Sequence, residues 1–114
     1  MTMVAEQTWV AVCPADEVLR AYGVAALLAG AEQVAIFRTE DDEFFALSNI
    51  DPFSRAAVLS RGIVGDRGGL PVVASPIYKQ AFDLRTGVCV DDPDVTVPTY
   101  PVRVLDGVVQ VKSP

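Results

Sequence analysis

Residues 75–87 read S-P-I-Y-K-Q-A-F-D-L-R-T-G and combine three local signals. The polar, proline-containing start of the stretch predicts a loop. The short apolar-rich run Ala81 to Leu84 predicts a strand. Gly87 ends the stretch and predicts a turn, because glycine readily adopts the positive φ that many turns need. The side chains expected to fix this turn are Asp83, Arg85 and Thr86.

The same stretch resembles the second cluster-binding loop of Rieske iron–sulfur proteins, in which C-P-x-H-G is followed by a spacer and F-D-x-x-T-G. Ser75 occupies the cysteine position and Tyr78 the histidine position, whereas Phe82 to Gly87 keeps the family pattern. The first cluster-binding loop, C-x-H in that family, corresponds to Asn49-Ile50-Asp51. The resemblance implies a Rieske-like fold whose former ligand positions are Asn49, Asp51, Ser75 and Tyr78.

The ligand chemistry of a Rieske cluster is missing from this chain. Such a cluster needs two thiolates and two imidazoles. The chain has no histidine, and its two cysteines, Cys13 and Cys89, lie outside both loops. Asp51 and Tyr78 offer only two oxygens, whereas hard cations take six or more oxygen ligands. We therefore expect no metal, cluster or other cofactor in this chain. Reduced, buried thiols are predicted, and a disulfide between the two cysteines stays open.

Several function classes are disfavoured by composition. The lack of histidine removes the commonest general base and the Ser-His and Cys-His pairs, so the chain alone is predicted to be catalytically inactive. The glycine-rich run Arg61–Gly69 lacks the Lys-Ser/Thr ending of a phosphate-binding loop and predicts a tightly turned surface loop. A net charge of −6 disfavours nucleic acid as a partner, because phosphate backbones are bound by clustered Lys and Arg.

A single domain spanning residues 1–114, with residues 1–7 as a loose tail, is expected from the length of the chain. Apolar residues make up 51% of the chain, which indicates a folded globular protein. No apolar run reaches the roughly 20 residues that span a bilayer. The first seven residues also lack the positive charge and apolar core of a signal peptide. We therefore expect a cytoplasmic protein without membrane contact.

Short β-type runs dominate and predict an all-β fold, a Rieske-like sandwich or barrel of short antiparallel strands with one or two helical turns. Asp106-Gly107 predicts a two-residue hairpin, and residues 49–69 are expected to form a long loop. Strands are expected at 8–13, 24–28, 33–38, 43–47, 70–74, 81–84, 88–90, 100–105 and 108–111. Helical turns are expected at 16–20 and 55–59. The aromatic residues expected in the core are Trp9, Phe37, Phe44, Phe45 and Phe82.

Nearly the whole chain also resembles the small subunit of the assimilatory NAD(P)H-dependent nitrite reductase. The most specific segments are the Asn49-x-Asp51 loop and the Ser75-Pro-x-Tyr-Lys79 loop. The other matching segments are 9–14, 34–38, 52–54, 59–66, 80–87 and 98–111. The resemblance implies a non-catalytic companion of a large subunit that carries FAD, sirohaem and a four-iron cluster and reduces nitrite to ammonium. The companion would dock on the large subunit and position or stabilise it.

Two alternatives stay open at this stage. One is a cluster-free, Rieske-like interaction module for another oxidoreductase, and the other is a small-ligand or nucleic-acid binder without a redox link.

The residues of the two loops have two candidate roles if the loops meet at one end of the fold. Asn49 and Asp51 are suited to hydrogen-bond nearby turn backbone. The same end is suited to contact a partner, because aromatic and basic side chains are enriched at interfaces. The candidate partner contacts are Phe53, Arg55, Tyr78 and Lys79. A further prediction is that Tyr78 fills the space of the missing cluster, with its hydroxyl bonded to Asp51 or Ser75.

Overall fold

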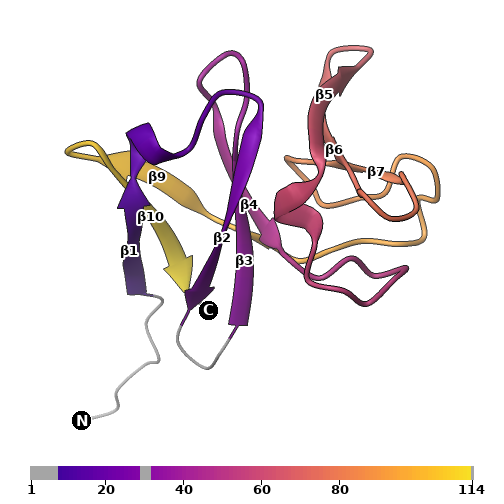
Figure 1. Cartoon of the computed structure of the whole chain (residues 1–114), viewed down its shortest axis with the longest axis horizontal. Helices are drawn as coiled ribbons and strands as arrows, with labels where there is room; N and C mark the ends of the chain where they lie inside the picture. The colour runs from indigo at the N-terminus through magenta and orange to yellow at the C-terminus, as the bar shows by residue number, and fades with distance from the viewer. Residues whose placement is uncertain (1–7, 29–31, 114) are drawn as a thin grey trace, which may run out of the picture.

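The computed structural model describes residues 8–28 and 32–113, so the predicted tail at residues 1–7 lies outside the described residues. Within these residues the chain forms short antiparallel strands and two single turns of 3-10 helix (Figure 1). The strands are β1 (Thr8–Pro14), β2 (Tyr22–Leu28), β3 (Glu32–Arg38), β4 (Phe44–Ser48), β5 (Ile63–Arg67), β6 (Leu70–Ala74), β7 (Ala81–Asp83), β8 (Thr99–Tyr100), β9 (Val102–Leu105) and β10 (Val108–Ser113). The helical turns are η1 (Ala15–Glu17) and η3 (Leu59–Arg61). Neither turn in this described part has the length and apolar character that a membrane-spanning helix needs.

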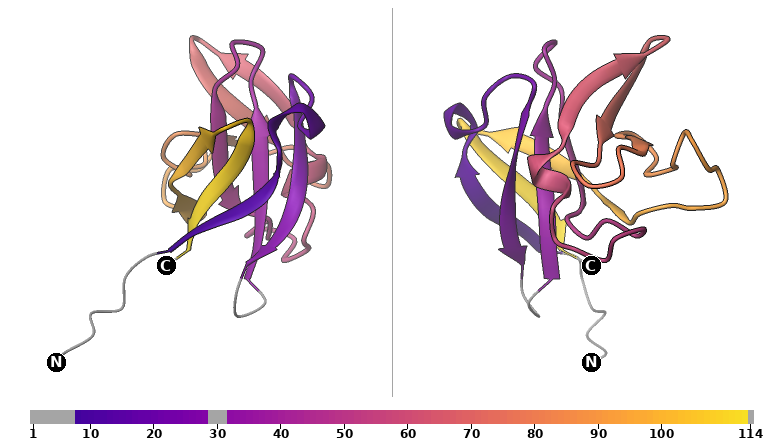
Figure 2. Two further views of the ribbon diagram at one scale, coloured as in Figure 1. Left: turned by 90° about the vertical axis from the view of Figure 1, so that its left-hand side faces the viewer. Right: turned by 45° about the vertical axis from the view of Figure 1, so that its right-hand side comes forward.

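Three small sheets make up the fold. Their strand orders are β1-β10-β9, β2-β3-β4-β8 and β5-β6-β7. The turned views in Figure 2 show the β1-β10-β9 sheet against one face of the central sheet and the β5-β6-β7 lobe on the other side. This arrangement confirms the predicted all-β class of short antiparallel strands and divides the described strands among three sheets.

β3, like its neighbour β4, contributes side chains to both hydrophobic cores. Val34 and Ile36 point into the core beneath the β1-β10-β9 sheet, whereas Ala35 and Phe37 point into the core of the β5-β6-β7 lobe. All four side chains are fully buried. Successive side chains of a strand point to opposite faces, so a run of four apolar residues is what a strand covered on both faces requires.

The long loop expected at residues 49–69 is wrong for its second half. Ile63–Arg67 forms β5, which pairs with β6 in the register Arg67↔Leu70 to Ile63↔Ala74. Gly68 and Gly69 form the two-residue turn between these strands, both with positive φ (60° and 90°). The glycines were correctly expected to turn the chain. The hairpin was missed because β5 reads Ile-Val-Gly-Asp-Arg, which shows no alternation of apolar and polar residues.

Several other elements have boundaries that differ from the predicted ones. Thr99 to Leu105 is split into β8 and β9 at Pro101, which has no N–H to donate to a ladder. Residues 88–90 make only isolated bridges and no strand. The helical turns lie at 15–17 and 59–61, whereas 16–20 and 55–59 were expected. The Asp106-Gly107 hairpin is confirmed, with φ of 52° and 77° at the two turn residues.

The aromatic predictions divide into two groups. Phe37 and Phe82 are fully buried, as expected. Phe44 and Phe45 are half-buried. Trp9 is also half-buried and lies on the outer surface of its sheet, with the Arg103 guanidinium 4.1 Å from its ring centroid. The long arginine side chain packs on the Trp9 ring while its charged head stays in water, so the ring is partly covered without lying in the core.

Both cysteines are free thiols. Cys89 is buried in the core of the β5-β6-β7 lobe, whereas Cys13 packs against the other core. They belong to different cores, and the disulfide left open by the sequence is not formed.

Replacement of Gly87 by alanine tests the close approach of the Val97 carbonyl to the Gly87 backbone. Gly87 has φ of +79°, and a Cβ atom there would collide with the carbonyl oxygen of Val97. Gly68 also has positive φ (+60°), but a Cβ there meets no atom within 4 Å. We expect Gly68→Ala to cost about 1–2 kcal/mol from the left-handed conformation alone, and Gly87→Ala to cost clearly more. Urea unfolding of both variants measures the difference, and equal losses would contradict the contact.

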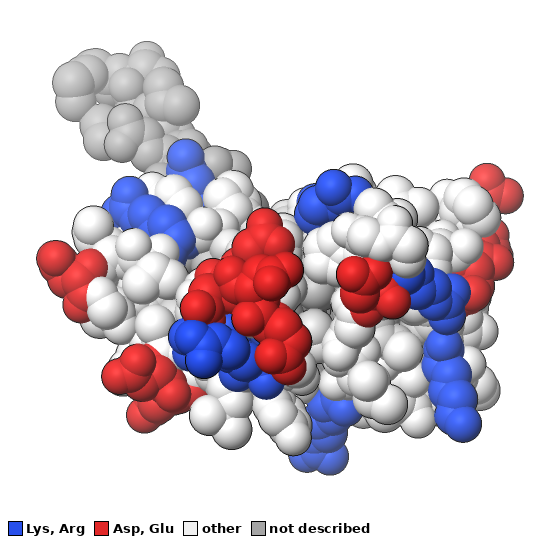
Figure 3. Space-filling view, turned by 90° about the horizontal axis from the view of Figure 1, so that it is seen from above, with Lys and Arg blue, Asp and Glu red and all other residues white. Residues whose placement is uncertain are grey.

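Replacement of Asp42 by asparagine tests an ionic cluster over the β3–β4 turn, where acidic and basic side chains adjoin in the view from above (Figure 3). Hydrogen bonds from Arg20 and then Arg38 lower the pKa of Asp42 from 3.8 to about 2. A lowered folded-state pKa gives stability that is complete above the unfolded pKa and is lost as pH falls through the folded value. We expect Asp42→Asn to be less stable than wild type above about pH 4, with the difference closing towards pH 2 in unfolding curves. Asp41→Asn is the control, and a pH-independent gap for Asp42→Asn would contradict the ionic origin.

Candidate functional site

The same six-residue turn conformation occurs at residues 51–56, 75–80 and 83–88, in and beside the β5-β6-β7 lobe. In each copy the amide of the first residue donates to the carbonyl of the sixth at 2.9 Å. The carbonyl of the first residue accepts the amide of the fifth at between 2.7 and 3.0 Å. The side chain of the first residue, Asp51, Ser75 or Asp83, accepts the amide of the third. The sequence favours this local structure, because Asp and Ser side chains bond the backbone two residues ahead.

The third turn confirms the roles predicted for its side chains. Asp83 Oδ1 accepts the Arg85 amide at 2.9 Å and the Arg85 Nε at 3.4 Å. Thr86 Oγ1 accepts the Val88 amide at 3.2 Å. These bonds fix the turn that follows the second loop.

The first two turns lie side by side and form what we call the tip, residues 49–57 and 75–80. They are joined by a hydrogen bond in which Ser75 Oγ donates to Asp51 Oδ2 at 2.5 Å. Asp51 is fully buried and Ser75 is 1% exposed. Two of the four former ligand positions are therefore bonded to each other.

Asn49 holds the first loop against the neighbouring helical turn. Its Oδ1 accepts the Ser60 amide at 2.7 Å, and its backbone carbonyl accepts the Leu59 amide at 3.1 Å. The side chain is 2% exposed. The hydrogen-bonding role expected for Asn49 and Asp51 is thus seen for both, although the partner of Asn49 lies eleven residues away rather than within the same turn.

Tyr78 does not fill the space between the loops, so that prediction is wrong. Its side chain is 57% exposed. The Asp51 carboxylate accepts hydrogen bonds from the Ser75 hydroxyl and the Phe53 amide. Within the described residues, the Tyr78 hydroxyl is hydrogen-bonded to neither Asp51 nor Ser75. Two short side chains, Ser75 and Asp51, bond to each other between the loops instead.

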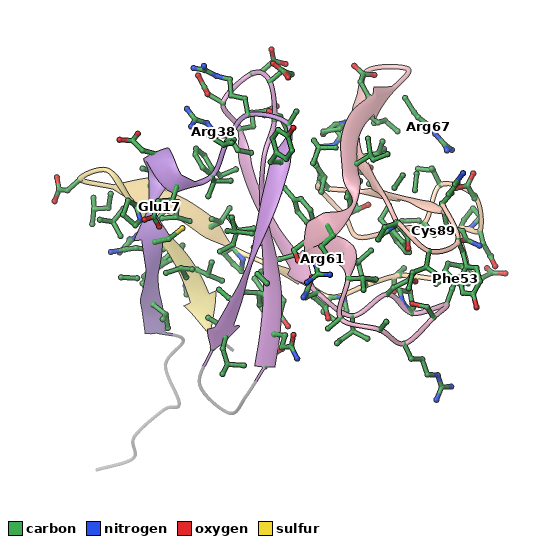
Figure 4. The ribbon with its side chains drawn as sticks, in the orientation of Figure 1. Glu17, Arg38, Phe53, Arg61, Arg67 and Cys89 are labelled. Atoms are coloured by element: carbon green, nitrogen blue, oxygen red, sulfur yellow. The ribbon has the colours of Figure 1, made fainter. Side chains whose placement is uncertain are left out.

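The candidate contact residues fall into two environments. Arg55, Tyr78 and Lys79 are exposed. Phe53 is half-buried and packs on Phe82, with 6.2 Å between ring centroids (Figure 4). Phe53 therefore supports the first loop from inside the lobe. The apolar surface of the tip comes instead from two residues that sequence reasoning missed, Ile50 and Ile77, which are 37% and 45% exposed.

The residues at the tip do not fit a two-iron cluster. Thiolate and imidazole ligands are required, whereas the four positions carry an amide, a carboxylate, a hydroxyl and a phenol. The Asn49 oxygen already accepts an amide, and the Asp51 carboxylate already accepts a hydroxyl and an amide. Within residues 8–28 and 32–113, no group of three or more His, Cys, Asp or Glu side chains is placed to hold a metal ion.

Comparison with known proteins identifies both a domain family and a narrower protein family for this chain. A family model described as a Rieske-like [2Fe-2S] domain matches residues 8–112. The nitrite reductase (NADH) small subunit of Salmonella typhimurium is 50% identical over 106 residues, which cover 92% of this chain and 97% of that protein. The chain belongs to the nitrite reductase small-subunit family. This membership confirms the resemblance read from the two loops.

This small-subunit family member is also similar to a solved structure and to part of a larger protein. A crystal structure described as an NADH-dependent nitrite reductase small subunit from Mycobacterium tuberculosis superposes with a TM-score of 0.92 at 52% identity, covering 96% of this chain and 97% of that one. A nitrite reductase [NAD(P)H] large subunit of Klebsiella oxytoca is 45% identical over 103 residues, which are 90% of this chain but 11% of that protein.

The sequence of this small-subunit family member predicted four former ligand positions but not the contacts of their side chains. A hydroxyl and a carboxylate at positions 75 and 51 were visible in the sequence, and their pairing was a possible signal. The repeat of a small polar residue followed by proline, at Asp51-Pro52 and Ser75-Pro76, was the signal for the matched turns.

Replacement of Ser75 by alanine tests the bond between the two loops. Without the hydroxyl, one oxygen of a fully buried carboxylate loses its donor, and we expect a stability loss of about 1–3 kcal/mol. Ser54→Ala is the control, because the half-buried Ser54 Oγ accepts only the Ala56 amide at 3.2 Å. Denaturant unfolding of both variants provides the measurement. An equal, small loss for the two would mean that the Ser75–Asp51 bond contributes nothing specific.

Proposed function

We propose that this chain is a cytoplasmic, non-catalytic small subunit of NAD(P)H nitrite reductase, which docks on the large subunit through its tip and positions or stabilises it. The high identity to small subunits over nearly the full length of both chains supports the assignment to this enzyme. The Klebsiella oxytoca relative supports the association, because a segment similar to this chain is part of a protein named as a large subunit.

The observation that carries the proposal is the chemistry of the tip. Side chains at three of the four former ligand positions are turned into the protein and hydrogen-bonded there, and the fourth, Tyr78, points to solvent. The exposed surface of the tip includes Ile50, Ile77, Tyr78 and two cations. An apolar and aromatic patch with Arg or Lys at its edge has the composition of a protein interface.

The division of chemistry between the subunits follows from the same residues. No side chain at the tip supplies a nucleophile with an adjacent base, and the chain has no histidine. We therefore propose that the redox cofactors, FAD, sirohaem and a four-iron cluster, all belong to the large subunit. The small subunit contributes a surface whose shape is fixed by the paired loops.

Replacement of Tyr78 by alanine tests the docking surface. We expect the affinity for the purified large subunit to fall roughly tenfold or more, because an exposed tyrosine at the centre of an interface is a common energetic hot spot. Tyr22→Ala is a matched control, because Tyr22 is 62% exposed and lies on β2, outside the tip. Isothermal titration calorimetry with wild type and both variants gives the three affinities.

Two results would contradict the proposal in different ways. Equal affinity of wild type and Tyr78→Ala, with Tyr22→Ala weakened, would move the docking surface away from the tip. Absence of any binding by the wild-type chain would reject the large subunit as partner and favour an interaction module for another oxidoreductase.

A further inference from the structure

The exposed charge of the tip is all of one sign. Arg55 and Lys79 are exposed, and Asp51, the one carboxylate among residues 49–57 and 75–80, is fully buried. The chain as a whole carries a net charge of −6. The tip is therefore a locally positive end on an acidic protein.

The two cations occupy the same position in matched turns. Arg55 is the fifth residue of the turn at 51–56, and Lys79 is the fifth residue of the turn at 75–80, each with φ of 64°. A residue with a Cβ disfavours this left-handed conformation. The third copy of the turn places Gly87 there, with φ of 79°. The turn itself therefore does not require a long basic side chain, and two such side chains at strained positions point to a role outside the turn.

Neither cation is used inside the protein. Four other arginines form ion pairs with carboxylates; these are Arg20, Arg38, Arg67 and Arg85. Arg103 and Lys112 lie over the Trp9 ring. Arg55 and Lys79 form no ion pair within the described ranges 8–28 and 32–113, so both charges stay available to a partner.

We propose that Arg55 and Lys79 act as a pair of cations that recognise carboxylates on the large subunit, beside an apolar contact made by Ile77 and Tyr78. This inference rests on the proposed docking function and adds the chemistry of the partner's surface. That surface is an apolar depression bordered by Asp or Glu side chains. The Ser75–Asp51 bond fixes the spacing of the two cations, because it joins the turns that carry them.

The opposite signs of the tip and of the rest of the chain also give an orientation to the encounter. An acidic surface on the large subunit repels most of this protein and attracts the tip. Complementary charges of this kind accelerate association and suppress wrong orientations, and salt weakens the effect. The association rate constant is therefore expected to fall steeply between about 0.1 M and about 1 M salt, where the screening length drops from about 10 Å to about 3 Å.

The chain offers a direct test by zero-length cross-linking, because its only lysines are Lys79 and Lys112. A carbodiimide condenses an amine and a carboxylate that are in direct contact into an amide. With the large subunit purified with its cofactors from the same organism, we expect mass spectrometry to find Lys79 linked to an Asp or Glu of that subunit. Lys112, at the Trp9 ring, serves as the internal control and is expected to stay unlinked. A linked Lys112 with an unlinked Lys79 would overturn the inference.

Charge reversal provides the quantitative test. We expect the double variant R55E/K79E to associate with the large subunit at least roughly tenfold more slowly than wild type at low salt. Its rate constant should rise with salt instead of falling, because salt screens the new repulsion between the glutamates and the acidic surface. The control is R103E/K112E, which changes the net charge by the same amount on the Trp9 face. Biolayer interferometry at the two salt concentrations measures both rate constants. Equal slowing by the two double variants would mean a general charge effect and would overturn the inference.

The outcome for Tyr78→Ala separates this inference from the docking function on which it rests. If Tyr78→Ala weakens binding while R55E/K79E does not, and salt has no effect, the tip docks through apolar contacts alone and the acidic partner surface is wrong. If none of the tip variants changes binding of the large subunit, tip docking itself is wrong. Circular dichroism spectra of the variants confirm that each is folded.

Discussion

The burial of β3 on both faces is the constraint on which the rest of the structure depends. Val34 and Ile36 form one core with the β1-β10-β9 sheet, and Ala35 and Phe37 form the other with the β5-β6-β7 lobe. A register slip of one residue would exchange the two sets, so both cores fix the same register. Because β4 leads from the central sheet directly into Asn49, this register also sets where the first loop begins.

The tip converts that framework into a defined surface with few residues. Each loop folds as the same six-residue turn, and one hydrogen bond between Ser75 and Asp51 joins them. A two-iron cluster would hold such loops together through four metal bonds. Here a buried hydroxyl–carboxylate bond joins the two loops, and the Asn49–Ser60 contact holds the first loop against the neighbouring helical turn. Loss of the metal ligands is thus compatible with a rigid loop pair.

Much of the fold follows from local signals in the sequence. The Asp106-Gly107 hairpin, the buried run 34–37 and the turn at 83–88 are each encoded by a few neighbouring residues. β5 was missed because Ile63–Arg67 is held by pairing with β6 and is largely exposed. Its two adjacent apolar residues are followed by Gly-Asp-Arg, so the apolar alternation that identifies a strand is absent. The position of Tyr78 was also missed, since its orientation depends on whether another group fills the space between the loops.

The sequence by itself determined the family, the all-β class and the absence of the thiolate and imidazole ligands, because these depend on residue identities at fixed spacing. The tertiary structure decided which side chains meet. Asp51 and Ser75 are separated by 24 residues, and their bond exists only because two turns on different strands converge. The same convergence brings together the two turns that carry Arg55 and Lys79, which no local pattern could show. The chemical groups that a chain carries are given by its sequence, whereas the pairing of distant polar groups depends on how the strands next to them pack.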